Sequence, residues 1–158
     1  MAKYDPQLGA DDYKMLLQSL MDKIRDRVRI DLVRLVGAQF EHIDNRLVAL
    51  ELLQQQMTEV VMFDKKGWPI HPSEFLYKQN LLIVSGSFRP ITRVNIDMIN
   101  AGTLQFKNDI SNEKARTYVV PKITLNSLKA ETGEVDEKDF IDRCNLLNYL
   151  GYTVLLSN

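Results

Sequence analysis

The first third of the chain has the hydrophobic spacing of amphipathic helices. Residues 11–56 contain no proline, and apolar residues recur there every three or four positions. The recurring positions are Leu17, Leu20, Ile24, Val28, Leu32, Leu35 and Val36, followed by Phe40, Ile43, Leu47, Leu50 and Leu53. Gly37 separates the two runs, so the pattern fits either two helices or one bent helix. We therefore expect residues 1–56 to form an N-terminal helical arm.

The apolar stripe of this arm is too long to form a core by itself. Charged residues of both signs surround the stripe, as on the solvated face of a surface helix. The stripe must therefore pack either on the rest of the chain or on another chain. We predict that these helices contact a protein partner or a second copy of the chain, and the pattern equally permits packing on the chain's own sheet.

The spacing changes to that of strands after Met57. Residues 58–63 alternate and are rich in β-branched side chains, residues 64–67 have turn composition, and residues 68–70 begin a short return. This pattern predicts a small hairpin. A short helix entered near Ser73 then leads into residues 81–84, whose uninterrupted apolar run is typical of a strand that is buried on both faces.

A second strand follows a helical segment that covers about residues 93–106. It spans residues 117–124, and Pro121 within it favours an edge position or a bulge because proline lacks a ladder donor.

The last part of the chain predicts a helix and a final strand. Asp136 is a candidate cap for a helix over residues 137–150, Gly151 ends that helix, and residues 152–156 form the strand. Residues 117–157 thus predict a strand-helix-strand unit with a right-handed crossover. The expected fold is α/β, with α+β character at the N-terminus. Residues 57–158 would be a small domain with a Rossmann-like, mostly parallel sheet of three to four strands, unless the arm and the sheet make one compact unit.

Composition narrows the possible functions without choosing one. The 158 residues include 20 Lys and Arg against 21 Asp and Glu, so a net charge of −1 gives no general attraction for nucleic acid or for an anionic membrane. No apolar run is long enough to span a bilayer, and the first residues lack the apolar core of a signal peptide, so we expect a cytoplasmic protein. One cysteine, Cys144, excludes a disulfide within the chain, and two histidines leave little for a metal site, so we expect none.

The most distinctive segment is the turn between the strand at 81–84 and the helix that follows it. Gly86 lets a ligand approach the backbone, and Ser87 and Thr92 offer hydroxyl groups near a helix N-terminus, which favours anions. Arg89 and Arg93 flank the turn, where they are either phosphate ligands or ordinary surface arginines. The alternative for the whole segment is a tight strand-to-helix connection without a ligand.

The segment Gly86-Ser-Phe-Arg-Pro-Ile-Thr resembles the opening motif of the nicotinamide or nicotinate mononucleotide adenylyltransferases. In that family the motif follows the first strand of a Rossmann-like sheet, holds ATP phosphates and closes on a histidine. Asn95 stands at the position of that histidine, and an amide can bind phosphate but lacks the imidazolium charge. The second family motif, a serine/threonine and arginine segment, is absent. The resemblance implies a site for ATP with Mg²⁺ made by Gly86, Ser87, Phe88 and Thr92, with Asn95 and Arg89 or Arg93 supporting the transferring group.

A wider resemblance covers about two thirds of the chain. Residues 52–158 resemble the front part of a longer, little-characterised bacterial family, in which phrases similar to GSFRPITRVNIDM, VDEKDFIDR and LGYTVLLSN recur. In that family a further α/β portion follows the last of these phrases. This resemblance implies no particular activity.

Two functions remain as hypotheses. The first is a non-catalytic interaction or assembly protein, which the missing motifs favour. The alternative is a nucleotidyltransferase of the adenylyltransferase type that binds ATP at the Gly86 turn. Whether the chain is an enzyme is left open by the sequence.

Overall fold

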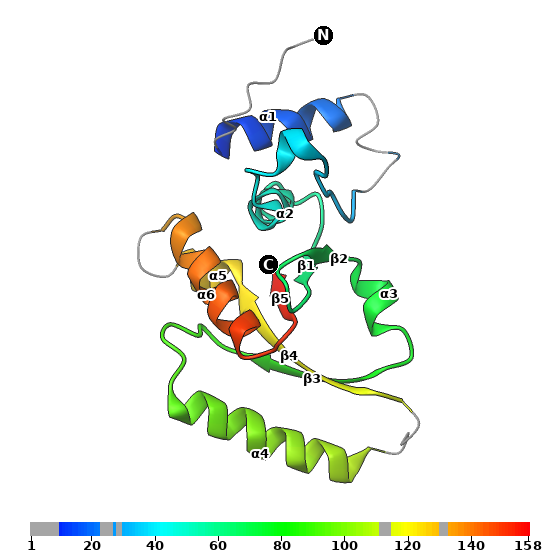
Figure 1. Cartoon of the computed structure of the whole chain (residues 1–158), viewed down its shortest axis with the longest axis vertical. Coiled ribbons are helices and arrows are strands. Elements are labelled where there is room, and N and C mark those ends of the chain that lie inside the picture. The colour runs from blue at the N-terminus through cyan, green and yellow to red at the C-terminus, as the bar shows by residue number, and fades with distance from the viewer. Residues whose placement is uncertain (1–9, 23–26, 28–29, 111–114, 130–132) are drawn as a thin grey trace.

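A computed structural model describes residues 10–22, 27, 30–110, 115–129 and 133–158 of the chain (Figure 1). The fold is mixed α/β, with a mostly parallel sheet of five strands and six α-helices in the described residues. The elements are α1 (Ala10–Met21), the 3₁₀ helix η1 (Ala38–Phe40), α2 (Asn45–Gln54), β1 (Val60–Phe63), β2 (Pro69–Ile70), α3 (Pro72–Leu76), β3 (Asn80–Ser85), α4 (Arg93–Asp109), β4 (Thr117–Thr124), α5 (Leu125–Lys129), α6 (Glu137–Tyr149) and β5 (Val154–Ser157).

The five strands lie in the order β2-β1-β5-β4-β3. Strands β3, β4 and β5 pair in parallel, whereas β1 is antiparallel to both β2 and β5. The predicted hairpin is therefore confirmed, and so is the parallel pairing of β4 and β5 around α6. The expected count of three to four strands was too low because the hairpin joins the same sheet. In β1, Val61, Met62 and Phe63 are all buried, so this strand has apolar neighbours on both of its faces.

The expected burial of β3 and the expected position of β4 were wrong. Strand β3 is not buried on both faces, because it lies at an edge of the sheet and Ile83 within it is 46% exposed. Strand β4, which contains Pro121, lies between β3 and β5. The proline fits there because Pro121 is paired with Val84 of β3, and pairing with β5 begins only at the next residue, Lys122.

The N-terminal segment is less helical than its spacing predicts. Helix α1 ends at Met21, Ile24 and Val28 lie outside the described residues, and residues 30–36 form no helix. The side chain of Asn45 explains the irregular segment, because its Oδ1 accepts from the Leu35 N–H at 2.7 Å and its Nδ2 donates to the Leu35 carbonyl at 3.1 Å. The predicted break at Gly37 is confirmed, since this residue has a φ of 131° and precedes η1.

Within the same chain, α2 packs on the sheet and α1 packs on α2. Leu50 and Leu53 of α2 belong to the cluster that contains Phe63, and Leu17 of α1 packs with Leu52 on the other side of α2. Figure 1 shows α1 stacked on α2 at one end of the molecule. Of the predicted stripe, Leu17, Ile43, Leu50 and Leu53 are buried in the chain, whereas Leu20 is 48% and Val36 67% exposed. A partner on these helices stays a prediction. The division of the chain at residue 56 stays a prediction.

The two faces of the sheet are covered unequally. The larger apolar cluster lies on one face and includes side chains of α2, α4 and α6. The smaller cluster, on the other face, includes Phe75 and Leu76 of α3. Helix α4 lies at the end of the molecule opposite α1 (Figure 1). Among the helices that the structure describes, none has both the length and the apolar character that a membrane span requires.

Candidate functional site

The Gly86 turn connects the carboxyl end of β3 to the first residue of α4. The Gly86 N–H donates to the carbonyl of Lys122 at 3.1 Å, so the ladder between β3 and β4 continues into the turn. Ligands of open α/β sheets bind at this end of the strands. The turn therefore lies where the sequence placed it relative to the sheet, although its strand is at the edge.

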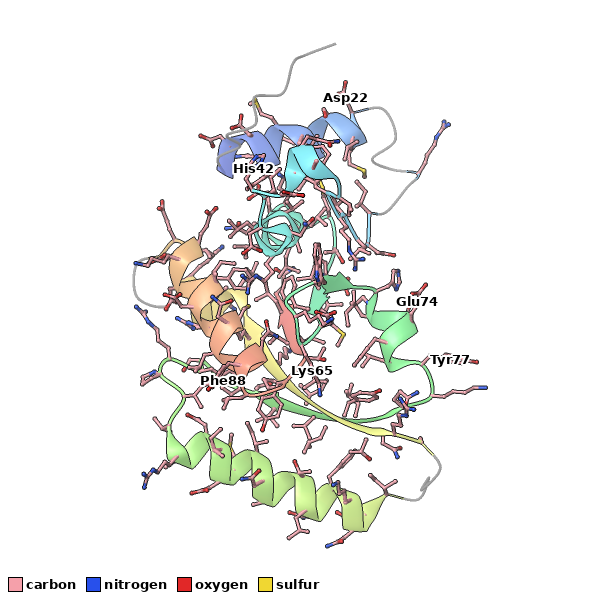
Figure 2. All side chains as sticks on the ribbon, in the orientation of Figure 1. Asp22, His42, Lys65, Glu74, Tyr77 and Phe88 are labelled. Carbon is pink, nitrogen blue, oxygen red and sulfur yellow. The ribbon has the colours of Figure 1, made fainter. Side chains whose placement is uncertain are left out.

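Phe88 occupies the space next to Gly86. This phenylalanine is 2% exposed, has a φ of 50°, and points from the turn into the molecule (Figure 2). A Cβ atom added to Gly86 would lie 3.1 Å from Cζ of the Phe88 ring. The glycine is consequently needed for the packing of the chain's own phenylalanine, and Phe88 is part of the core rather than of an exposed surface.

Thr92 and Asn95 cap α4 through each other. Thr92 Oγ1 accepts from the Asn95 N–H at 3.4 Å, and Asn95 Oδ1 accepts from the Thr92 N–H at 2.8 Å and from the Thr92 hydroxyl at 2.9 Å. This reciprocal arrangement is a capping box. Asn95, which stands at the position of the histidine in the adenylyltransferase motif, therefore helps to begin α4.

A buried arginine of α6 forms a hydrogen bond with the backbone of the Gly86 turn. Arg143 is 4% exposed, donates from Nη1 to the Ser87 carbonyl at 2.9 Å, and pairs through Nη2 with Oδ2 of Asp139 at 2.5 Å. Arg89 pairs with the other oxygen of the same Asp139 at 2.9 Å. The sequence analysis missed Arg143. Its signal was a charged residue on the apolar face of α6, between Phe140 and Leu147.

The predicted ligand residues lie together in the turn, with unequal access to solvent. Ser87, Arg89, Thr92 and Arg93 are exposed, Gly86 and Asn95 are half-buried, and Phe88 is buried. Three cavities in the described part of the chain are lined by other segments. These residues are close together in space because they are close in the sequence, so their proximity is not evidence for a ligand. The binding of ATP stays a prediction.

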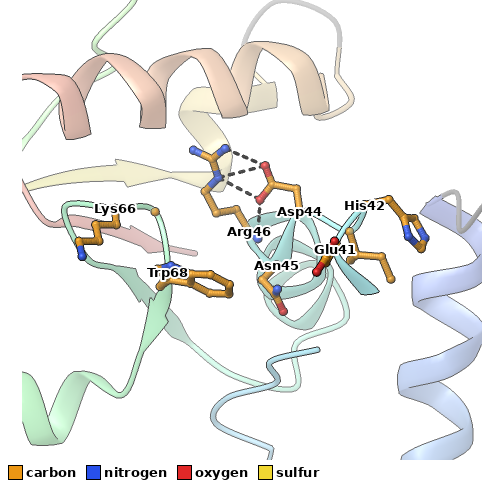
Figure 3. Close-up of a pocket in the computed structure, with 9 residues that line it drawn as sticks. Glu41, His42, Asp44, Asn45, Arg46, Lys66 and Trp68 are labelled. Carbon is orange, nitrogen blue, oxygen red and sulfur yellow. Dashed lines mark hydrogen bonds and ion pairs between the residues drawn. The ribbon is translucent and has the colours of Figure 1, made fainter. Parts of the chain in front are cut away.

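One of these cavities, of about 360 Å³, lies between the start of α2 and the hairpin turn (Figure 3). Its lining residues are Glu41, His42, Ile43, Asp44, Asn45, Arg46, Lys66, Gly67 and Trp68. Asp44 and Arg46 form an ion pair in the wall of the cavity, with Arg46 Nη2 2.7 Å from Asp44 Oδ2, and Arg46 Nη1 also donates to the side chain of Asn145. The hydrogen bond to Asp44 raises the pKa of Arg46 above its ordinary value, which keeps the ion pair charged. These contacts join α2 to α6, so Asp44 and Arg46 have a structural role in the wall of the cavity.

Nucleophilic and metal chemistry have little support in the described residues. Burial raises the pKa of the Cys144 thiol to about 12, so the thiol stays protonated and unreactive. No group of three or more His, Cys, Asp or Glu side chains in the described residues is arranged to hold a metal ion.

The outer face of α4 exposes several large apolar side chains, as does the end of α6 at Leu146, Tyr149 and Leu150. Ile99 is the one buried residue of this 17-residue helix, and Gly102 also faces the sheet, because a Cβ there would lie 3.8 Å from Leu82. Three large apolar side chains point outward: Val94 is 73%, Met98 47% and Leu104 66% exposed. Sequence analysis predicted a docking surface on the N-terminal helices, and this stays a prediction.

No protein-family model, curated protein or solved structure matches this chain. The resemblance of the segment from Gly86 to Thr92 to the adenylyltransferase motif accordingly stays a prediction, as does the resemblance of residues 52–158 to a longer bacterial family. The function must be argued from the geometry.

Proposed function

We propose that this chain is a non-catalytic interaction or assembly protein, in which a Rossmann-like unit binds another polypeptide through the outer face of α4. The observation that carries the proposal is the exposure of Val94, Met98 and Leu104 on a helix that buries only Ile99. The parallel order β3-β4-β5, with α4 and α6 as the connections, supports the Rossmann-like part.

The physical argument concerns the outer side of a helix that covers a sheet. Such a helix normally presents polar residues to water and apolar residues to the core. On α4 the three apolar side chains are exposed together with the polar residues Asp97, Gln105 and Asn108. A surface that mixes large apolar and polar side chains is typical of a non-obligate protein interface. The open edge of β3, which carries no charged residue, adds unpaired backbone groups next to this helix.

The arrangement of the Gly86 turn favours the non-catalytic part of the proposal. Phe88 fills the space beside the glycine, Asn95 caps the helix, and Arg143 binds the Ser87 carbonyl. Phe88 and Arg143 would have to rearrange before they could contact a phosphate, and the side-chain oxygen of Asn95 is already used by the cap.

The proposal is tested by the size of the complex that the tagged full-length chain forms in its native extract. We expect the double variant Val94→Glu/Leu104→Glu to elute at the mass of the free chain, whereas wild type and the control Gln54→Glu/Gln56→Glu elute in a larger complex. Gln54 and Gln56 are exposed at the end of α2, away from α4 (Figure 1), and the control makes the same change in net charge. A wild-type chain that elutes at its own mass, or a complex that survives the double variant, would overturn the proposal.

Nucleotide binding at the Gly86 turn is tested separately by calorimetry with ATP and Mg²⁺ on the full chain. The proposed function predicts no heat of binding at micromolar nucleotide. Binding that is lost in Arg93→Ala but kept in Lys107→Ala, a control at the other end of α4, would instead support the adenylyltransferase alternative.

A further inference from the structure

Another cavity, of about 590 Å³, lies between the irregular segment 30–36 and the start of α3. Its lining residues are Leu32, Arg34, Ile70, His71, Glu74 and Phe75. None of these residues belongs to α4 or to the Gly86 turn, so the cavity is separate from the surface that the proposed function uses. Pockets that bind small organic molecules have volumes in this range.

The apolar part of the cavity wall is held in place by the sheet. Ile70 of β2 pairs with Met62 of β1, and the ring of Phe75 lies 4.7 Å from the ring of Tyr118 in β4. Ile70 and Phe75 both pack against the smaller apolar cluster of the sheet. Leu32 lines the cavity from segment 30–36. A fixed apolar wall of this kind favours a ligand that carries a hydrocarbon or aromatic group.

Two opposite charges line the same cavity. Arg34 donates from Nη2 to the Pro69 carbonyl, and its guanidinium carbon lies 5.6 Å from the centroid of the Trp68 ring. In the described part of the chain neither Arg34 nor the exposed Glu74 forms an ion pair. A guanidinium group has five N–H donors, so Arg34 keeps donors for an anion after it has bound Pro69.

From this combination we infer that the cavity binds a free α-amino acid with a large apolar side chain. The carboxylate of such a ligand matches Arg34, its ammonium group matches Glu74, and its side chain packs against the apolar wall. An apolar acid without an amine would leave Glu74 without a cation. An apolar amine without a carboxylate would leave Arg34 without an anion.

Amide spectra of the ¹⁵N-labelled full chain test this site, with L-phenylalanine as the probe. We expect saturable shifts at residues 32–34 and 70–75 and at the single indole N–H, that of Trp68, with half-saturation below about 1 mM. 3-Phenylpropionate lacks the ammonium group and phenethylamine lacks the carboxylate, so each should bind several-fold more weakly. The inference would be overturned by equal binding of the three probes, or by no saturable shift at these residues up to about 10 mM phenylalanine.

Two variants test the two charges separately. Glu74→Gln, at an exposed position, should weaken phenylalanine binding about three- to fivefold and leave 3-phenylpropionate unchanged. Glu59→Gln is the matched control, because Glu59 is also exposed and lies outside the cavity wall. Arg34→Gln should weaken both acids and leave phenethylamine unchanged, which also shows that the cavity of this variant is intact. Equal phenylalanine affinity in Glu74→Gln and Glu59→Gln would contradict the assignment of the ammonium group to Glu74 and overturn the inference.

Discussion

Helices α4 and α6 have the same place in the topology and opposite relations to the core. Each leads into the next parallel strand, and both contribute to the larger apolar cluster. The 13-residue α6 buries Phe140, Arg143, Cys144 and Leu147, whereas the 17-residue α4 buries only Ile99. The outer apolar residues of α4 are therefore not part of the core, and the proposed function assigns them to a partner.

The largest effect that separates the two helices is expected from their apolar side chains. Phe140→Ala removes a fully buried ring that lies 6.0 Å from the ring of Phe63, so we expect the free energy of unfolding to fall by about 3–5 kcal/mol. Leu104→Ala on α4 should change it by less than about 0.5 kcal/mol in the monomer. Denaturant unfolding at low protein concentration measures both values. A large loss in Leu104→Ala would contradict the division between core helix and docking helix.

A smaller effect is expected at the buried arginine by which α6 holds the Gly86 turn. Arg143→Met leaves Asp139 and the Ser87 carbonyl without their main buried donor, so unfolding should become easier by about 2–3 kcal/mol. Arg89→Met is the matched control, because this exposed arginine pairs with the same carboxylate and should cost less than about 1 kcal/mol. Equal losses in the two variants would mean that burial of Arg143 is unimportant for the turn.

The smallest effect is a pH dependence at the start of α6. Burial, then the nearby charges of Glu51 and Asp136, raise the pKa of Glu137 above its ordinary value. The folded chain therefore binds this proton more tightly than the unfolded chain, and the ionised carboxylate destabilises the fold as pH rises through the folded pKa.

Glu137→Gln should accordingly raise the melting temperature at pH 7 by about 1–2 °C, and this gain should disappear as pH falls below the ordinary carboxyl range. Thermal unfolding between pH 3.5 and pH 7 measures the difference between wild type and variant. A gain that is independent of pH would contradict the role of the charge.

The elements that sequence analysis predicted well are those fixed by neighbouring residues. The hairpin followed from alternation and a turn at residues 64–67, and the start of α6 followed from Asp136, whose side chain accepts from the N–H groups of Lys138 and Asp139. The residues of the Gly86 turn were also found, because glycine, proline and a helix entry stand together in the sequence.

The features that were missed depend on distant parts of the chain. The edge position of β3 and the interior position of β4 are set by strand pairing, which local apolar patterns do not determine. The irregular course of residues 30–36 depends on Asn45, and the burial of Arg143 depends on its hydrogen bond to Ser87, 56 residues away. For the same reason the spacing of the N-terminal stripe did not reveal which of its residues pack inside the chain, such as Leu17 and Leu50, and which are exposed, such as Val36.

Hydrogen exchange of the free chain and of the chain in its native complex tests most directly whether α4 is a docking helix. In the free chain the amides of α4 should exchange faster than those of α6, since one buried residue gives α4 little protection. In the complex, α4 should gain protection while α6 stays unchanged. Exchange from α4 that is equally fast in the free chain and in the complex would contradict the account.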